Sequence, residues 1–265
     1  MIDAAPSIFN EISKLENSGE SAALCVIIQT QGAVPRRAGA KMLVYEDGRF
    51  VGTVGGGELE NRVRAEAKDA MADGRPRKIS YSMVEPTRGD PGVCGGTAEV
   101  YIEPILPKME LLIIGAGHVG EKLAQLANWL EFDVIVSDDR VELCTPEACP
   151  GASIYLPVPM CEIPNHIKIN NRTIIVLTTR GSDVDIEGLP DLLKYQSGYV
   201  GVIGSKRRWA ITRKGLLEKG VPEAVVDSIH SPIGLEIHAE TPEEIAVSIM
   251  AQIIMECNRA SGQKM

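Results

Sequence analysis

Residues 111–120 read LLIIGAGHVG, an apolar run that passes directly into closely spaced glycines. The run predicts a buried strand, and Gly115, Gly117 and Gly120 have the G-x-G-x-x-G spacing of a dinucleotide-binding loop between a strand and a helix. In such a loop the first glycine permits the tight turn, the second lets a pyrophosphate approach the backbone, and the third lets helix and strand pack closely. The stretch therefore predicts a Rossmann-type fold.

Two acidic residues, Asp138 and Asp139, follow the next apolar run, at about the 20-residue distance where a Rossmann carboxylate accepts a hydrogen bond from a ribose hydroxyl. His118 lies inside the glycine loop, where it either contacts a ligand or faces solvent. We predict nucleotide contacts from the loop, His118 and the two aspartates. The alternative is that the same glycines serve packing alone.

Strand-like and helix-like segments alternate downstream of Glu110, which is typical of a doubly wound parallel sheet. The expected strands are ELLIIG, FDVIVSD, TIIVLTT and YVGVIG, and the expected helices run through Leu130, near Leu189 to Gln196, from Ser205 and from Thr241. The last helix has a proline at its first position and a capping-box glutamate, Glu244.

The first half has a different pattern. Strand-like runs flank Asp47-Gly48, a strong hairpin signal, and a helical pattern after Gly57 ends at Gly74. We therefore predict an α/β protein with a smaller N-terminal α+β domain at residues 1–107 and a Rossmann-like domain at residues 108–265.

Composition limits the functional classes. The 265 residues include 36 acidic and 27 basic side chains, a net charge of −9, which argues against nucleic acid or an anionic membrane as partner. No segment approaches the roughly 18 apolar residues of a spanning helix, and we expect a cytoplasmic protein. Six cysteines are too few for a disulfide scaffold. Cys144, Cys149, Cys161 and His166 lack the paired spacing typical of zinc sites.

A second glycine cluster, Gly55-Gly56-Gly57, lies between a strand and a helix. Helix-start amides there, together with Arg36, Arg37 and Arg62, would suit a planar anionic ligand, although a purely structural turn explains the glycines as well.

Cys94 precedes Gly95 and Gly96 in the run PGVCGG, so neighbouring residues cannot shield its sulfur. Backbone amides could lower the pKa of its thiol and make the sulfur reactive. A buried, unreactive cysteine is the alternative.

A further anion site is predicted where the strand YVGVIG ends at Gly204, Ser205, Lys206, Arg207 and Arg208. Positive side chains at a helix start are repelled by the positive end of the helix dipole. A bound phosphate or an acidic partner would offset this repulsion and explain why they are there. A solvated basic face is the alternative.

The combined motifs resemble the XdhC/CoxI family, the accessory proteins that mature xanthine dehydrogenase and related molybdenum hydroxylases. The resemblance covers nearly the whole chain. It rests, in family order, on PRRAGAKMLVYEDGRFVGTVGGGELE, PGVCGGTAEVYIEP, LLIIGAGHVG, VIVSDDR, YVGVIGSKRR and SPIGLEIHAETPEEIAVSIMAQI.

This resemblance implies a carrier that binds the molybdenum cofactor, in its molybdopterin mononucleotide or dinucleotide form. The carrier would protect the cofactor while its terminal sulfido ligand is installed and pass it to the apo-hydroxylase. Cys94 would be a molybdenum or sulfur contact. A cysteine desulfurase-type sulfur donor and a homodimer are further expectations, and catalysis is not expected. The cofactor-binding residues that we predict are Arg37, Gly55, Gly56, Gly57, Glu58, Cys94, Gly95, Gly96, Gly115, Gly117, His118, Gly120, Asp138, Asp139, Gly204, Ser205, Lys206 and Arg207.

Two other functions stay open. An NAD(P)-dependent oxidoreductase would use the Rossmann loop and Asp138, although the sequence offers no evident Tyr-x3-Lys or His–acid pair. A docking scaffold would bind partner enzymes and no small ligand.

Overall fold

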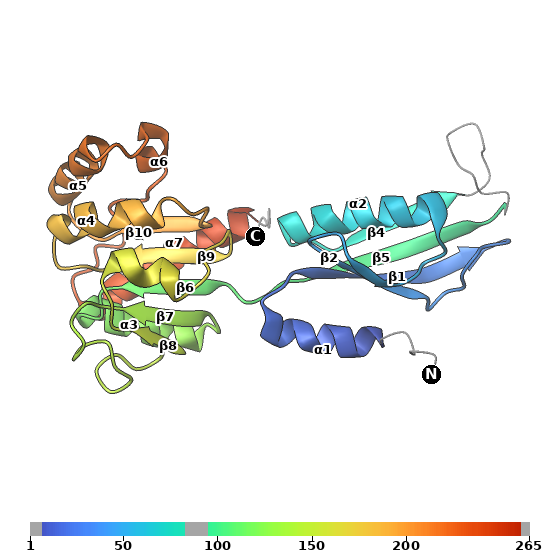
Figure 1. The fold of residues 1–265 in the computed structure, drawn as a ribbon, viewed down its shortest axis with the longest axis horizontal. Helices are drawn as coiled ribbons and strands as arrows, with labels where there is room; N and C mark the ends of the chain where they lie inside the picture. Colours follow the sequence, from blue (N-terminus) through green and yellow to red (C-terminus); the bar gives the residue numbers. More distant parts are fainter. Residues whose placement is uncertain (1–6, 83–94, 261–265) are drawn as a thin grey trace. The chain divides into compact units, whose positions relative to one another are not determined.

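The structure is a computed structural model that describes residues 7–82 and 95–260. These residues form two compact units, which divide between Pro107 and Lys108 and are described separately. The first unit contains an antiparallel sheet with helices, and the second contains a parallel sheet between helices (Figure 1). The predicted fold class, a Rossmann-like domain with a smaller α+β domain, is confirmed.

The first unit is a five-stranded sheet in the order β3-β2-β1-β5-β4, with two helices. Its elements are α1 (Ile8–Ser18), β1 (Ala22–Gln31), β2 (Lys41–Tyr45), β3 (Phe50–Gly52), α2 (Gly57–Asp73), β4 (Arg77–Ser82) and β5 (Thr97–Ile105). The predicted hairpin joins β2 to β3 in antiparallel register, with Gly48 at a positive φ of 89° in the turn. Helix α2 follows the predicted helical pattern and buries Leu59, Val63, Ala67 and Met71 against the sheet.

The second unit has a five-stranded parallel sheet in the order β10-β9-β6-β7-β8. Its elements are β6 (Glu110–Ile114), α3 (His118–Trp129), β7 (Asp133–Ser137), β8 (Ile154–Leu156), the 3-10 helix η2 (Met160–Asn165), β9 (Thr173–Leu177), α4 (Ser182–Leu192), β10 (Tyr199–Val202), α5 (Lys206–Glu218), α6 (Glu223–Asp227) and α7 (Pro242–Ala260). The first strand, β6, lies between β7 and β9, so the strand order reverses at its carboxyl end. Open α/β sheets bind ligands at such a reversal.

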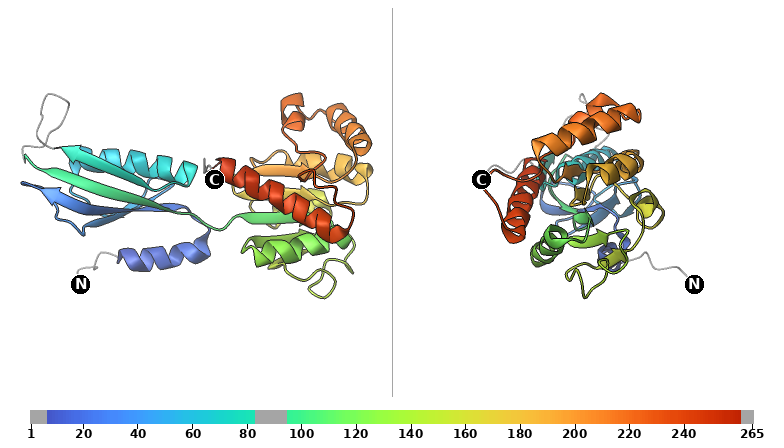
Figure 2. Two further views of the ribbon diagram at one scale, coloured as in Figure 1. Left: turned by 180° about the vertical axis from the view of Figure 1, so that it is seen from behind. Right: turned by 90° about the vertical axis from the view of Figure 1, so that its left-hand side faces the viewer.

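Helices cover both faces of this sheet (Figure 2). Helices α3 and α7 pack on one face, while η2, α4 and α5 pack on the other. Helix α7 begins as predicted, because Thr241 Oγ1 accepts from the Glu244 amide at 3.2 Å and the Glu244 carboxylate accepts from the Thr241 amide at 3.2 Å. The two faces explain why the strands read as continuous apolar runs rather than alternating ones.

The limits predicted for α4 are wrong. The helix covers Ser182–Leu192 rather than Leu189 to Gln196. Its buried face begins with Asp185 and Gly188, neither of which is apolar, so the hydrophobic pattern reveals only the second half of the helix. Gly188 is needed there because a Cβ would collide with the Met160 side chain in η2.

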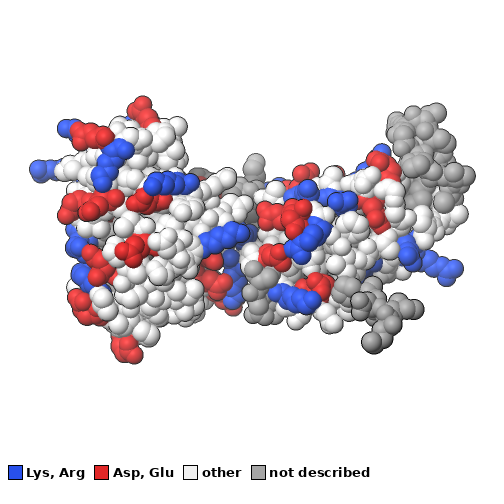
Figure 3. All heavy atoms as spheres, viewed as in Figure 1, with Lys and Arg blue, Asp and Glu red and all other residues white. Residues whose placement is uncertain are grey.

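In the part of the chain that the structure describes, no helix is long and apolar enough to cross a membrane. On the face drawn in Figure 3, Lys and Arg side chains are interspersed with Asp and Glu over both units.

Candidate functional site

The glycine loop of the second unit has the geometry predicted for its first and third glycines. Gly115 has a positive φ of 113°, and a Cβ there would lie 2.6 Å from the Thr178 carbonyl oxygen. A Cβ on Gly120 would collide with the Gly115 carbonyl oxygen. At Gly117, in contrast, no other described residue places a heavy atom within 4 Å of the Cβ position. The loop is therefore closely packed at both ends and open in the middle, beside the first turn of α3, where His118 is exposed.

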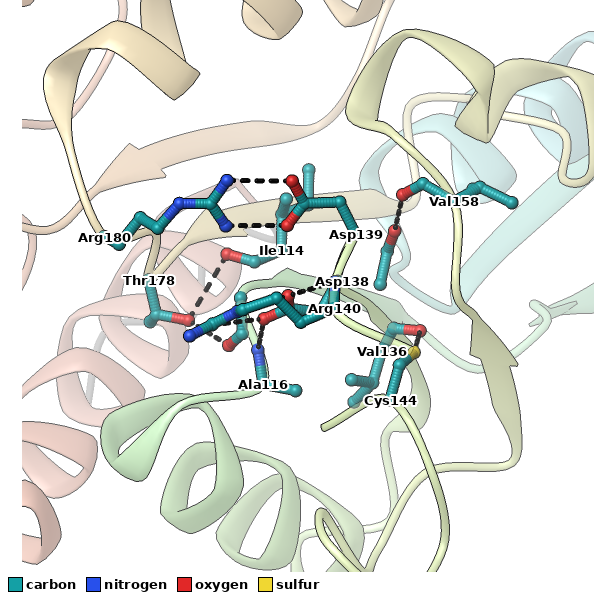
Figure 4. A network of polar contacts seen from close by, with 12 residues as sticks. Ile114, Ala116, Val136, Asp138, Asp139, Arg140, Cys144, Val158, Thr178 and Arg180 are labelled. Carbon is teal, nitrogen blue, oxygen red and sulfur yellow. Dashed lines mark hydrogen bonds and ion pairs between the residues drawn. The ribbon is translucent and has the colours of Figure 1, made fainter. Parts of the chain in front are cut away.

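Asp138 stabilises this loop from inside the protein (Figure 4). Its Oδ2 accepts from the Ala116 amide at 2.8 Å, and its side chain is 2% exposed. Arg140 donates to both oxygens, from Nε at 2.9 Å and from Nη2 at 2.7 Å. Burial raises the pKa of Asp138, but the hydrogen bonds from Arg140 and Ala116 outweigh it and lower the pKa overall. The predicted ribose acceptor thus already has partners within the chain.

The neighbouring carboxylate, Asp139, forms a bidentate pair with Arg180, at 2.7 and 2.8 Å. The pair joins the segment after β7 to the segment after β9, next to the end of β6 at Ile114 (Figure 4). The hydrogen bonds from Arg180 lower the pKa of Asp139 to about 2. Both side chains remain nearly half exposed.

A cavity of about 280 Å³ lies beside these pairs, at the carboxyl ends of β6, β7 and β9. Its lining residues are Ile114, Gly115, Ser137, Asp138, Asp139, Arg140, Val158, Pro159, Met160, Cys161, Thr179, Arg180, Val184, Glu187 and Gly188. The cavity brings the first glycine of the loop together with both predicted aspartates.

Sequence reasoning missed several lining residues. Arg140 and Arg180 lie shortly after the ends of β7 at Ser137 and β9 at Leu177, so their place near strand carboxyl ends was a usable signal. Cys161 and Glu187 come from η2 and α4 and carry no such signal. Cys161 is exposed.

At the predicted anion site at the start of α5, only some of the predicted residues are free to bind a ligand. Ser205 caps the helix by accepting from the Arg208 amide at 3.2 Å. A Cβ on Gly204 would lie 2.7 Å from Cδ of Arg208, so this glycine makes room for the arginine. In the described part of the chain, Lys206 and Arg207 are exposed and have no ion-pair partner.

Arg208 itself points inward. It donates to the Thr179 carbonyl oxygen at 3.0 Å, to Thr179 Oγ1 at 2.7 Å and to the fully buried carboxylate of Asp185 at 2.7 Å. Thr179 Oγ1 also donates to Asp185. This network attaches α5 and α4 to Thr179, which lines the cavity.

In the first unit, the segments predicted to bind a ligand meet at one place. Ala33 forms a parallel bridge with Gly95, and a Cβ on Gly32 would lie 3.1 Å from Cα of Gly96. A Cβ on Gly55 would lie 3.3 Å from Cβ of Pro35. The loop 32–37 therefore contacts both the glycine triplet and the glycines that follow Cys94.

The glycine triplet adopts a backbone that other residues avoid. Gly55, Gly56 and Gly57 all have positive φ, at 134°, 81° and 62°. Within the described residues, no atom lies within 4 Å of a Cβ placed on Gly56 or Gly57. The turn is held by Glu60, whose Oε1 accepts from the Gly56 amide at 2.9 Å and from the Val54 amide at 3.2 Å. The Glu60 carboxylate therefore binds amides at the start of α2, where we predicted that a ligand would bind.

The arginines near this turn differ in their contacts. Arg36 and Arg37 are exposed and have no ion-pair partner among the residues that the structure describes. Arg62 lies over the Tyr81 ring, 5.0 Å from its centroid, and pairs with Glu58 at 3.4 Å. Of the three arginines predicted to bind a ligand here, Arg36 and Arg37 therefore have no ion-pair partner among the described residues.

Cys94, the candidate molybdenum or sulfur contact, lies outside the described residues. Burial raises the pKa of the Cys25 thiol to about 12 and that of Cys149 to about 11, so neither forms a thiolate readily. In residues 7–82 and 95–260, no group of three or more His, Cys, Asp and Glu side chains is placed to hold a metal ion.

The second unit is a Rossmann-type domain with a built cavity at its strand reversal, and the comparisons with known proteins identify its family. Residues 111–253 match the XdhC Rossmann domain, and residues 15–82 match the XdhC and CoxI family. The chain belongs to the XdhC family, which confirms the resemblance predicted from its motifs.

Three relatives extend this comparison. YqeB of Escherichia coli K12 is 34% identical over 97% of this chain and 47% of its own length. A probable subunit of xanthine dehydrogenase from Bacillus subtilis is 33% identical over 62% of this chain and 48% of its own length. The molybdenum cofactor insertion chaperone PaoD of Escherichia coli is 23% identical over 89% of this chain and 83% of its own length. The chain therefore spans about half the length of the first two relatives.

A crystal structure described as a xanthine dehydrogenase from Bacillus halodurans is 25% identical and covers 96% of both chains, with a TM-score of 0.52.

Proposed function

We propose that this protein is a molybdenum cofactor chaperone, which binds the cofactor, protects it during sulfuration and inserts it into a xanthine dehydrogenase-type hydroxylase. The observation that carries the proposal is the similarity to the insertion chaperone PaoD along 89% of this chain. Family models match a segment of each unit as well. On this proposal the protein is a carrier of its cargo rather than an enzyme.

The chemistry of the first unit suits this cargo. Gly56 and Gly57 leave open space beside the first turn of α2, whose leading amides lack intrahelical partners. Arg36 and Arg37 can pair with a phosphate, and a flat pterin ring needs the close backbone approach that glycines permit. Cys94, next to Gly95, is the proposed transient ligand of molybdenum or relay of sulfur.

The residues of each domain that contact the cofactor, and the partner proteins, are part of the proposal. The glycine triplet and Arg37 of domain 1–107 would contact the cofactor. Gly115, Gly117 and His118 of domain 108–265 would make nucleotide-type contacts, with Gly120 closing the loop behind them. The partners would be the apo-hydroxylase and a cysteine desulfurase-type donor, met in the cytoplasm by a homodimer. Nucleic acid and membranes are not expected partners.

The second candidate function is an NAD(P)-dependent oxidoreductase, which the cavity beside the glycine loop favours. Asp138 argues against it, because the usual ribose acceptor is occupied by Ala116 and Arg140.

Activation of an apo-hydroxylase tests the proposal. Purified protein loaded with cofactor should restore activity to the apo-enzyme, and Cys94→Ser and Gly56→Glu should each abolish the transfer. Cys257→Ser and Gly19→Glu are matched controls, because Cys257 is a half-buried cysteine in α7 and Gly19 is another positive-φ glycine with open space around it. If the two site variants transfer cofactor as well as the controls do, the proposal fails.

A further inference from the structure

Helix α7 contains a longer uncharged stretch than its internal contacts require. Eleven consecutive residues, 245–255, carry no charge. Four of them are buried in the core of this face of the sheet: Ala246, Ile249, Met250 and Ile253. Two more, Ser248 and Gln252, form hydrogen bonds to the backbone of residues 234 and 235. A helix at a protein surface normally carries polar or charged residues on its outer side, so the composition of the remaining side of α7 needs another explanation.

This remaining side of α7 is apolar and faces α3. Val247 is 50% exposed and Ile254 is 38% exposed, and the half-buried Ala251 lies between them along the helix. Glu243, at the start of α7, pairs with Lys122 of α3 at 3.8 Å. Val247 and Ile254 follow Glu243 by four and by eleven residues, which is close to a whole number of turns in each case. They therefore lie on the side of α7 from which Glu243 reaches α3.

Helix α3 continues this apolar surface. Trp129 follows Lys122 by seven residues, about two turns, and its side chain is 76% exposed. The half-buried Leu126 lies between them and packs on the same core as α7. Figure 2 shows α3 and α7 next to each other on one face of the sheet. We call the following residues the α3–α7 patch: Leu126, Trp129, Val247, Ala251 and Ile254.

The α3–α7 patch is symmetric about one level of the two helices. Counted from the ion pair that joins the helix starts, Trp129 lies level with the midpoint between Val247 and Ile254. A surface with matching groups on both sides of its centre can pair with a second copy of itself, because a two-fold interface brings the same surface of both copies together. Val247 of one copy would then meet Ile254 of the other, and the two Trp129 side chains would lie near the axis.

Charged residues at the ends of the α3–α7 patch suit the same arrangement. Lys122 lies at one end, and the exposed Glu131 and Asp133 follow α3 at the other end. In an antiparallel pair, Lys122 of each copy would lie towards these two carboxylates of the other copy, which gives complementary charges at both ends. The centre of the patch carries no charge, and depletion of charge is typical of the buried core of an interface.

The size of the α3–α7 patch predicts a weak dimer. A helix is about 10 Å wide and rises about 1.5 Å per residue, so α3 with 12 residues and α7 with 19 residues present roughly 450 Å² per copy. Two copies would bury about 900 Å² in total, which is less than stable homodimers bury and is in the range of transient complexes. We therefore expect an affinity in the micromolar range.

We propose that the α3–α7 patch is the interface of a reversible homodimer, in which α7 of one copy packs antiparallel to α7 of the other. The inference rests on the proposed function only in that a homodimer is expected there, and it adds the surface through which the dimer forms. Helix α3 starts at the glycine loop and ends in the patch, so the interface lies away from the carboxyl edge of the sheet. Both copies can therefore hold a ligand at the same time.

Sedimentation equilibrium of the full-length protein tests the interface. The protein should be largely monomeric at about 1 μM and largely dimeric at about 200 μM. Val247→Glu should weaken dimerisation at least about tenfold, because the new charge would be buried without a partner. Ile211→Glu on α5 is the matched control, since Ile211 is 51% exposed and Val247 is 50% exposed. The control should leave the dimerisation constant within about twofold, and circular dichroism should show that both variants are folded.

Cross-linking tests the antiparallel arrangement without adding a charge. In a chain in which the exposed Cys161 is replaced by Ser, Ala251→Cys should form a disulfide between two copies when copper phenanthroline is added as oxidant. Residue 251 lies close to the proposed axis, so the two new thiols would face each other. Ile211→Cys in the same background should give no more cross-linked dimer than the background alone.

The proposal is overturned by any of three results: a protein that stays monomeric at about 200 μM, equal effects of Val247→Glu and Ile211→Glu, or equal cross-linking of Ala251→Cys and Ile211→Cys. These results do not depend on the cargo. A monomer that carries molybdenum and pterin would keep the carrier function and remove the interface, whereas a dimer as described that never carries them would remove only the carrier function.

Discussion

The glycine loop Gly115–Gly120 and the glycine triplet Gly55–Gly57 both lie between a strand and a helix, yet different forces exclude a side chain from each. In the first loop, Gly115 and Gly120 are surrounded by backbone atoms, and a Cβ would collide with them. In the triplet, positive φ angles exclude other residues, while the space beside Gly56 and Gly57 is open. Close packing requires Gly115 and Gly120, with a positive φ at Gly115 as well, whereas backbone conformation is what requires Gly56 and Gly57.

Both loops are also held by a carboxylate of the chain. Asp138 accepts from the Ala116 amide, and Glu60 accepts from the Val54 and Gly56 amides. Asp138 is buried and paired with Arg140, whereas Glu60 is only half-buried and serves its own turn. The comparison indicates that each loop is organised before a ligand arrives, and more firmly in the second unit.

Gly120→Ala should have the largest effect, because its Cβ would collide with the Gly115 carbonyl oxygen. We expect a loss of about 3 kcal/mol in the free energy of unfolding, the upper part of the range for overpacked positions. The added methyl of Gly117→Ala meets no atom of another described residue within 4 Å, so this variant should change the free energy of unfolding by less than about 0.5 kcal/mol. Urea unfolding followed by tryptophan fluorescence measures both, since Trp129 and Trp209 lie in the second unit. Equal losses would show that packing does not require Gly120.

Asp138→Asn should cost about 2 to 3 kcal/mol at neutral pH, because the hydrogen bonds from Ala116 and Arg140 lose a charged acceptor. The same urea experiment measures it. Asp133→Asn, at the exposed start of β7, the strand that precedes Asp138, is the control and should be nearly neutral. If Asp138→Asn is neutral too, the loop does not depend on this carboxylate.

Gly56→Ala should cost about 1 to 3 kcal/mol without any steric clash, because φ 81° with ψ 176° is a backbone region that is almost restricted to glycine. The first unit holds no tryptophan, so amide hydrogen exchange along α2 is the measurement. Glu58→Ala, two residues later, should stay within about 0.5 kcal/mol. Unchanged exchange in Gly56→Ala would mean that conformation is not the reason for the glycine.

Glu60→Gln should have a smaller effect, about 1 kcal/mol, because a neutral amide oxygen still accepts from Val54 and Gly56 but more weakly. Hydrogen exchange of those two amides should accelerate, and Asp69→Asn on the exposed side of α2 should leave them unchanged. Identical exchange in both variants would remove Glu60 from the account of the turn.

Asp139→Asn should have the smallest effect at neutral pH, below about 1 kcal/mol, because the pair with Arg180 is largely exposed to solvent. The pKa of Asp139 is lowered to about 2, against about 3.9 in an unfolded chain. Its stabilisation is therefore complete above about pH 4 and is lost as the pH falls towards 2. The difference between parent and variant in unfolding free energy should shrink over that window. A difference that grows on acidification would contradict the pairing.

The sequence was sufficient where a motif corresponds to one specific geometry. The spacing of Gly115, Gly117 and Gly120, read after an apolar strand, predicted the fold, the tight turn at Gly115 and the close packing at Gly120. The capping pattern of Thr241 and Glu244 likewise predicted the start of α7.

The sequence was insufficient where a role depends on which segments meet. Arg180 and Asp139 are 41 residues apart, and their pairing requires that β7 and β9 flank β6. Arg208 was predicted to be part of an anion site, but Asp185, buried in α4, binds it internally. Such partners become evident only once the strand order is known.

The most direct test of the account is the cofactor content of the protein itself, purified without oxygen from a host with ample molybdenum. Metal analysis and the fluorescence of oxidised pterin on one sample, with bound nucleotides released and identified in parallel, give the answer. The account predicts near-equal amounts of molybdenum and pterin in the parent protein and loss of both in Gly56→Glu. Nucleotide without pterin or molybdenum would contradict the carrier function and make the second unit the active part of the molecule.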